Sequence, residues 1–247
     1  YAGRLSALYA TDTFEGLFTV EYENRNQSGT LYRATEMGAS YETLQEIFGL
    51  ELGGNGRDID SDQGLGEADN GEAISLGLQL DFDLGGMTLT SLTGYKDHEF
   101  VYAEDFDGTP LRINDYAQDQ EGNYFEQEVR LVSDTSGPLS WYVGASYYHE
   151  EIDTLFTQGA DEDVMCNYYS YAYYYYAYNC EAYFGSFAYS PDGLIERNQV
   201  RGRYHGWAAY VDATWALTPK VDIGVGVRYS NDVKKFGINA LPVESEL

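Results

Sequence analysis

Residues 207–230 read WAAYVDATWALTPKVDIGVGVRYS, and this stretch decides the fold. Apolar side chains occupy every second position of its first half, and small or polar residues such as Asp212 and Thr214 stand between them. The second half, from Val221 to Tyr229, repeats the alternation. A period of two is typical of a β-strand with one apolar and one polar face. The proline between the halves predicts a tight turn, so we expect an antiparallel hairpin.

The same alternation recurs along the chain and predicts eight strands. They are expected near residues 3–10, 14–23, 73–82, 87–102, 121–133, 139–155, 203–217 and 221–236. Short turns rich in Gly, Pro or Asp join alternate pairs of strands, whereas the connections through residues 24–72, 103–120 and 156–202 are long. Because no helical crossover pattern lies between the strands, the sheet is expected to be antiparallel and up-and-down.

Two kinds of fold could carry this pattern: a soluble sandwich or lipocalin-like barrel, and a barrel that spans a membrane. The polar face is rich in small residues, as in a wide aqueous lumen, and Trp and Tyr gather toward strand ends. Short turns on one side and long loops on the other are typical of outer-membrane barrels. We therefore favour an all-β, antiparallel up-and-down transmembrane β-barrel. The side chains expected to contact lipid include Ile74, Leu76, Leu78, Leu80, Val211, Val225 and Val227.

Three short motifs follow one another in the second half of the chain. Residues 128–131 read EVRL and precede a predicted short turn, Trp141 and Gly144 form a W-x-x-G pattern, and residues 226–229 read GVRY. In this order the motifs resemble the middle of the barrel of TonB-dependent outer-membrane receptors. The matching stretches are residues 87–155 and 203–236.

The resemblance implies a receptor that takes up a scarce nutrient, such as a siderophore, haem, a vitamin or a saccharide, through a plugged barrel. It also implies coupling to a TonB-type energy complex, and no cofactor. The family's plug domain and its terminal strand ending in an aromatic residue are absent, so residues 1–247 are expected to be a partial barrel domain. An open sheet would also leave unpaired strand edges in lipid. The resemblance places this barrel in the bacterial outer membrane, and the long loops are expected outside the cell.

Two other functions stay open at this point: a passive channel or a structural or adhesive surface barrel, and an outer-membrane hydrolase. Catalysis finds little support, because His98, His149 and His205 show no metal-ligand spacing and are expected at strand ends or at the membrane interface. Motifs for a nucleophile elbow or a phosphate cradle are missing. The sequence therefore predicts a protein that is not an enzyme.

The excess of acidic over basic residues limits the kinds of partner that the protein can bind. Asp and Glu number 41 against 14 Lys and Arg, which gives a formal net charge of −27. Nucleic-acid binding requires a basic face, so this composition argues against it. The long loops are acidic as well, and their field favours a neutral or cationic ligand such as a saccharide, a peptide or an uncharged metal complex.

Residues 166–180 read CNYYSYAYYYYAYNC, with the chain's two cysteines at the ends. In a loop outside the cell, Cys166 and Cys180 are expected to form a disulfide. Tyrosine offers an apolar ring and a hydroxyl and has few rotatable bonds, which suits a contact surface. The ligand-contact candidates are Tyr168, Tyr171, Tyr173, Tyr175, Tyr176 and Tyr178. The alternatives are that these rings pack within their own loop and stiffen it, or that the stretch self-assembles.

Two further groups are candidates for polar sites. Asp58, Asp60 and Asp62 alternate as in a calcium-binding loop, but the turn glycine and the final glutamate of that motif are missing, which makes a solvated acidic loop the main alternative. Arg130 and Arg228 are expected to face the lumen, where they would pair with carboxylates such as Glu128 and Asp212 or contact a plug.

Overall fold

The computed structural model of the chain describes residues 1–36, 38–52, 59–62, 64–134, 137–166 and 193–245. Its strands are β1 (Ala2–Ala10), β2 (Phe14–Gln27), β3 (Ala68–Asp83), β4 (Met87–Asp105), β5 (Asp115–Ser133), β6 (Leu139–Ala160), β7 (Leu194–Thr218) and β8 (Val221–Ala240). One helix of this part of the chain, α1 (Ala39–Phe48), lies between β2 and β3.

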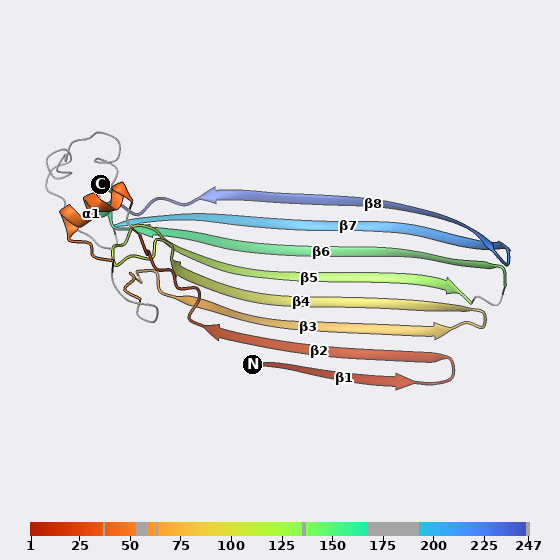
Figure 1. Ribbon diagram of the computed structural model, residues 1–247. Helices are drawn as coiled ribbons and strands as arrows, with labels where there is room; N and C mark the ends of the chain where they lie inside the picture. Colours follow the sequence, from red (N-terminus) through yellow and green to blue (C-terminus); the bar gives the residue numbers. More distant parts are fainter. Residues whose placement is uncertain (37, 53–58, 63, 135–136, 167–192, 246–247) are drawn as a thin grey trace.

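The strands form a single sheet in the order β1 to β8, and every neighbouring pair is antiparallel (Figure 1). The short connections β1–β2, β3–β4 and β7–β8 lie at one end of the sheet, which we call the turn end. The connections between β2 and β3, β4 and β5, and β6 and β7 all leave from the opposite end, the loop end. The predicted up-and-down topology is therefore confirmed.

The strand bounds agree with the sequence prediction at the turn end and differ at the loop end. There β5 begins at Asp115 rather than at residue 121, and β7 begins at Leu194 rather than at 203. In these upper segments polar side chains stand on both faces of the strand, as at Asp119 and Gln120. The alternation of apolar and polar residues therefore disappears while the backbone ladder continues.

The pairing register divides the side chains into an apolar face and a polar face. Val211 is opposite Val143 on one side and Val227 on the other, and Leu76 is opposite Val20, so these residues share the apolar face. The face assigned to lipid by sequence is thus one continuous surface. Many large apolar side chains on this surface are exposed, and that of Val225 is 65 % exposed. Among the described residues no helix is long and apolar enough to cross a membrane.

Two rows of aromatic side chains cross the apolar face. The lower row lies near the turn end and contains Tyr9, Phe14, Phe82, Trp141 and Trp215. The upper row contains Tyr22, Tyr95, Phe125, Tyr147, Trp207 and Tyr229. Trp207 and Trp215 lie eight residues apart on β7, which is about 26 Å along the strand and about 20 Å of height once strand tilt is included. The apolar band of an outer-membrane barrel is about 25 Å tall, so the two rows lie near the edges of such a band.

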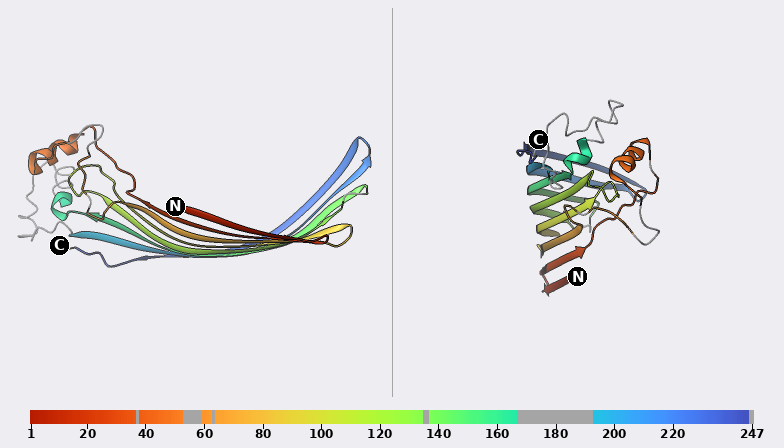
Figure 2. Two further views of the ribbon diagram at one scale, coloured as in Figure 1. Left: turned by 90° about the horizontal axis from the view of Figure 1, so that it is seen from below. Right: turned by 90° about the vertical axis from the view of Figure 1, so that its left-hand side faces the viewer.

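A small apolar core lies at the loop end, not within the sheet. Leu44 of α1, Leu50 and Val164 are buried there, and Leu111 and Ile113 of the β4–β5 connection pack against them. Figure 2 shows that the sheet is arched along its strands and that α1 lies on the concave side. The helix was not predicted, although Tyr41, Leu44 and Phe48 have helical spacing.

Candidate functional site at the polar face and the loop end

The polar face is built from tyrosines that lie across glycines. The Tyr210 hydroxyl of β7 donates a hydrogen bond of 2.8 Å to Glu128 Oε1 of β5, two strands away. Gly144 of the strand between them makes room, because a Cβ there would overlap the Tyr210 ring. In the same way the Tyr148 hydroxyl reaches Asp232 Oδ1 at 2.9 Å, over a glycine of β7. The small residues of the polar face therefore leave room for tyrosine side chains that hydrogen-bond across two strands.

The arginines predicted to face the lumen lie in this network, but their pairing is only partly as expected. Arg130 Nη1 lies 4.0 Å from Glu128 Oε1. The guanidinium of Arg228 lies over the ring of Tyr210, 5.5 Å from its centre, and no ion pair joins it to Asp212 among the described residues. A cation on an aromatic face keeps part of its exposure, so Arg228 remains available to a partner.

A second cluster joins the loops at the loop end, and we call it the loop hub: Asp62, Asp105, Asp107, Arg112 and Asp115. Arg112 Nε donates to Asp115 Oδ2 at 2.8 Å, and the same nitrogen lies 3.9 Å from Asp62 Oδ2. Both partners of the shorter pair are buried, with side-chain exposures of 6 % for Arg112 and 1 % for Asp115. The hub therefore contains more buried acids than cations.

The β4–β5 connection is the centre of the hub. Asp107 accepts hydrogen bonds from the backbone of Thr109 and Asn114 and folds this connection on itself. Backbone bonds then attach other segments: the amide of Asp62 donates to the carbonyl of Thr109 at 2.9 Å, and Asp161 donates to that of Arg112 at 2.8 Å. The β4–β5 connection thus holds the β2–β3 and β6–β7 connections, which are far apart in sequence.

The close fit around Arg112 depends on glycine. A Cβ at Gly159 would lie 2.7 Å from Arg112 Nη2, and one at Gly64 would overlap Nε of the same side chain. Such distances are too short for a side chain, so Gly64 and Gly159 let the backbone approach the guanidinium. Neither the two glycines nor Arg112 was selected from the sequence, because they lie far apart in the chain.

Burial of several acids at one place raises their pKa values. Desolvation, with the nearby charge of Asp107 second, raises the pKa of Asp105 to about 7. Desolvation also raises the pKa of Asp115 to about 6, with Asp62 adding to the shift and Arg112 opposing it. One oxygen of each carboxyl, Asp105 Oδ2 and Asp115 Oδ1, is buried and has no hydrogen-bond partner among the described residues.

Acidification is expected to stabilise the loop hub. A carboxyl whose folded pKa exceeds its unfolded value near 3.8 favours folding most at low pH, and that contribution is lost as pH rises through the folded value. For Asp105 and Asp115 the loss falls between about pH 4 and 7. Amide hydrogen exchange in residues 106–114 should therefore be slower at pH 5.5 than at pH 8, after correction for intrinsic rates. Equal protection at both values would contradict the expectation.

The ligand and disulfide candidates from the sequence mostly lie outside the described residues. This applies to Cys180, Asp58 and all six candidate tyrosines, while Cys166 is described and lies in a helical stretch with residues 162–165. The disulfide and the tyrosine surface stay predictions. The calcium site also stays one: Asp62 lies in the loop hub, and no group of three metal-binding side chains is found in the part of the chain that is described.

The predicted histidine positions can be placed. His149 and His205 lie side by side on the apolar face, next to the upper aromatic row, with ring centres 6.4 Å apart. His98 lies on the polar face, where its Nε2 is 3.2 Å from the side-chain nitrogen of Gln120. None of the three lies beside an arrangement suited to nucleophilic catalysis in the described residues.

Comparisons with known proteins find similarity in structure and not in sequence. No family model and no curated protein matches the sequence. The ferric yersiniabactin uptake receptor FyuA from Yersinia pestis matches 98 % of this chain with a TM-score of 0.59 and 14 % identity. The ferric citrate transporter FecA matches 96 % with a TM-score of 0.42 and 12 % identity. The chain spans 33 % of the length of either protein.

The likeness to the yersiniabactin receptor concerns the fold, and there it agrees with the sequence motifs. This chain has the fold of part of the barrel wall of a TonB-dependent outer-membrane receptor, as those motifs predicted.

Proposed function

We propose that this chain is part of the barrel domain of an outer-membrane receptor that takes up a scarce nutrient, with the loop end outside the cell. The observation that carries the proposal is the two-sided wall. One side has an apolar band between two aromatic rows, as a lipid-facing surface requires, and the other has cross-braced tyrosines, carboxylates and arginines. The protein would bind and move its ligand without changing it chemically.

The two ends of the polar face support different roles. The loop hub joins three connections at the loop end, and the apolar core around α1 packs against one of them. Together they shape the surface that a ligand meets first. Arg130 and Arg228 lie lower on the polar face, where a plug domain would contact the wall in a receptor of this kind. Coupling to a TonB-type complex is part of the proposal on the strength of the family resemblance.

The chemistry of the ligand follows from charge. At −27 the chain repels strongly anionic compounds, and a neutral or cationic ligand, such as a saccharide, a peptide or an uncharged metal complex, would be tolerated best. Tight, salt-insensitive binding of a polyanionic siderophore to the purified receptor would contradict this choice.

Energised uptake can be separated from passive flow. A strain that lacks the gene should fail to accumulate the limiting nutrient, and the gene should restore accumulation. The restored uptake should stop when the proton gradient of the inner membrane is collapsed. Accumulation that continues without the gradient would favour the passive channel, and growth unaffected by the deletion would favour a structural or adhesive barrel.

Replacing Tyr171, Tyr173 and Tyr175 by Ser is expected to weaken ligand binding by about tenfold or more, because aromatic contact residues often contribute over 1 kcal/mol each. Binding of the transported compound to the purified receptor measures the effect. The control replaces Tyr142 by Ser, because Tyr142 lies on the polar face near the turn end and belongs to neither aromatic row. If both variants assemble and bind equally well, the tyrosine-rich segment is not the contact surface.

A further inference from the structure

Basic residues are concentrated at one place on an otherwise acidic protein. The chain has 14 Lys and Arg in 247 residues, yet Arg201, Arg203 and Lys235 lie together on the apolar-face side of β7 and β8. Arg203 and Lys235 are direct cross-strand partners. Like charges at such positions repel one another, so their pairing calls for a nearby anion. We call these three residues the basic patch.

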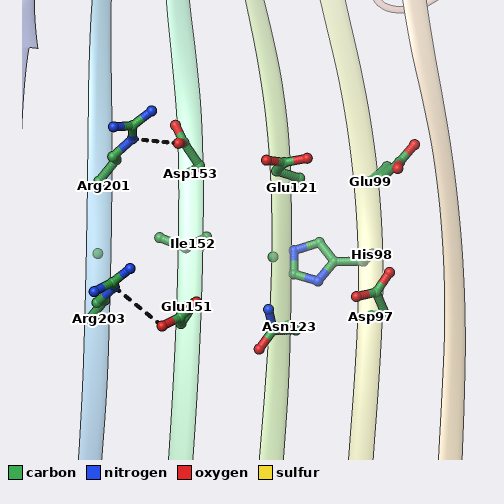
Figure 3. A pocket seen from close by; sticks show the side chains of 12 residues that line it. Asp97, His98, Glu99, Glu121, Asn123, Glu151, Ile152, Asp153, Arg201 and Arg203 are labelled. Atoms are coloured by element: carbon green, nitrogen blue, oxygen red, sulfur yellow. Dashed lines mark hydrogen bonds and ion pairs between the residues drawn. The ribbon is translucent and has the colours of Figure 1, made fainter.

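The acids of the protein neutralise only part of the basic patch. Arg201 Nε lies 2.6 Å from Asp153 Oδ2, and Arg203 Nε lies 3.2 Å from Glu151 Oε1 (Figure 3). Both arginines bond through Nε and remain 69 % and 73 % exposed, so their terminal amino groups face outward. Lys235 has no ion-pair partner among the described residues. Donors for a second, external anion are therefore present.

The height of the basic patch above the apolar band limits what that anion can be. Arg203 lies four residues beyond Trp207 of the upper aromatic row, about 13 Å along β7, and strand tilt reduces this to about 10 Å of height. Aromatic rows mark the level of lipid headgroups. Arg203 and Lys235 thus stand just above the headgroups of the leaflet on the loop side, and Arg201 stands about 5 Å higher. The long side chains of all three residues can extend toward the headgroups.

The neighbouring strands set a boundary beside the basic patch. At the same level β4 and β5 carry Asp97, Glu99 and Glu121, which Figure 3 shows next to the arginine pairs. An anionic group is repelled there and attracted over β7 and β8. Below the patch, Val211 and Val227 continue the apolar surface toward the turn end, where acyl chains can lie.

We propose that the basic patch is a binding site for a lipid in the outer leaflet whose phosphate-bearing headgroup carries a net negative charge. The headgroup contacts Arg201, Arg203 and Lys235, and the acyl chains lie on the apolar face beneath them. Guanidinium groups suit phosphate because their donors match its oxygens in pairs. The inference rests on the proposed membrane location and adds a lipid partner to it.

The test compares lipid retention by the full protein reconstituted in nanodiscs of phosphatidylcholine with a minor share of phosphatidylglycerol. The R201Q/R203Q/K235Q variant should retain phosphatidylglycerol about tenfold less well than the unchanged protein, as counted by native mass spectrometry. The matched control R4Q/K96Q/K234Q removes three cations from the polar face and should retain it normally. Lys235→Gln alone, which breaks no ion pair in the described structure, should lower retention about threefold to fivefold.

Each outcome decides between the two proposals. If the unchanged protein inserts but holds phosphatidylglycerol and phosphatidylcholine equally, or if the control loses as much lipid as the patch variant, the basic patch is not a lipid site and the membrane location stands. If the triple variant fails to fold, Lys235→Gln decides alone, and unchanged retention overturns the inference. If the unchanged protein does not insert into nanodiscs at all, the proposed membrane barrel is itself wrong.

Discussion

Val227→Arg is expected to prevent most of the protein from assembling in a membrane. Val227 is 64 % exposed on the apolar face, and its cross-strand partner Val211 lies midway between Trp207 and Trp215. An arginine near the midplane of a barrel costs about 2–4 kcal/mol, which is roughly a 30-fold to 1000-fold change in the ratio of folded to unfolded protein. The folded fraction after refolding into lipid vesicles, read from heat-modifiable gel mobility, measures the effect.

The matched control for this substitution is Gly224→Arg, three residues away on the polar face. A Cβ at Gly224 would lie 3.4 Å from Thr214 Oγ1, an ordinary contact, so the side chain can extend into water. Gly226 would be a poorer control because a Cβ there would lie 2.5 Å from Asp212 Oδ2. Equal folding of the two arginine variants would show that the faces have been assigned wrongly.

Arg112→Leu is expected to release the loop hub while the sheet stays folded. The substitution leaves Asp115, which is 1 % exposed, and Asp62 without their cation. Breaking a buried pair in this way costs about 3–5 kcal/mol. Amide exchange should accelerate in residues 106–114 and in α1, whose core includes Leu111, and remain unchanged in the central strands.

Two controls make this result specific. Arg4→Leu breaks an exposed ion pair with Glu21, whose partners are 65 % and 49 % exposed, and should cost less than about 1 kcal/mol. Adding Asp115→Asn to Arg112→Leu removes one buried charge and should restore much of the protection. If Arg112→Leu exchanges like the unchanged protein, the arginine does not hold the hub.

The part of the fold that could be predicted from sequence is the part that faces lipid. The apolar residues on every second position define the strands near the turns, and β2, β4, β6 and β8 begin at the predicted residues, Phe14, Met87, Leu139 and Val221. Above the upper aromatic row both faces of the sheet are in contact with water, so the strands there need no alternation of apolar and polar residues. Length and register there are set by backbone pairing, which leaves little trace in composition.

The loop hub could not be predicted for a different reason. Arg112 and Asp115 are neighbours in sequence, but Asp62 and Gly64 come from the β2–β3 connection and Gly159 comes from the end of β6. Each residue alone looks like ordinary loop composition, and burial, which gives them their raised pKa values, follows only from the tertiary fold. The helix α1 is an intermediate case, because its spacing was visible but the loop around it was interpreted as irregular.

The length of the strands has a consequence for the cell surface. A barrel strand needs about 9–11 residues to cross a bilayer, and β7 has 25. The remainder amounts to roughly 45 Å of strand, or about 35 Å of height once tilt is included. In the proposed orientation the β-sheet continues above the membrane, and its outer surface there carries charged side chains. An antibody or a phage would therefore meet hydrogen-bonded sheet as well as variable loops, and escape by sequence change on that wall would be limited by strand pairing.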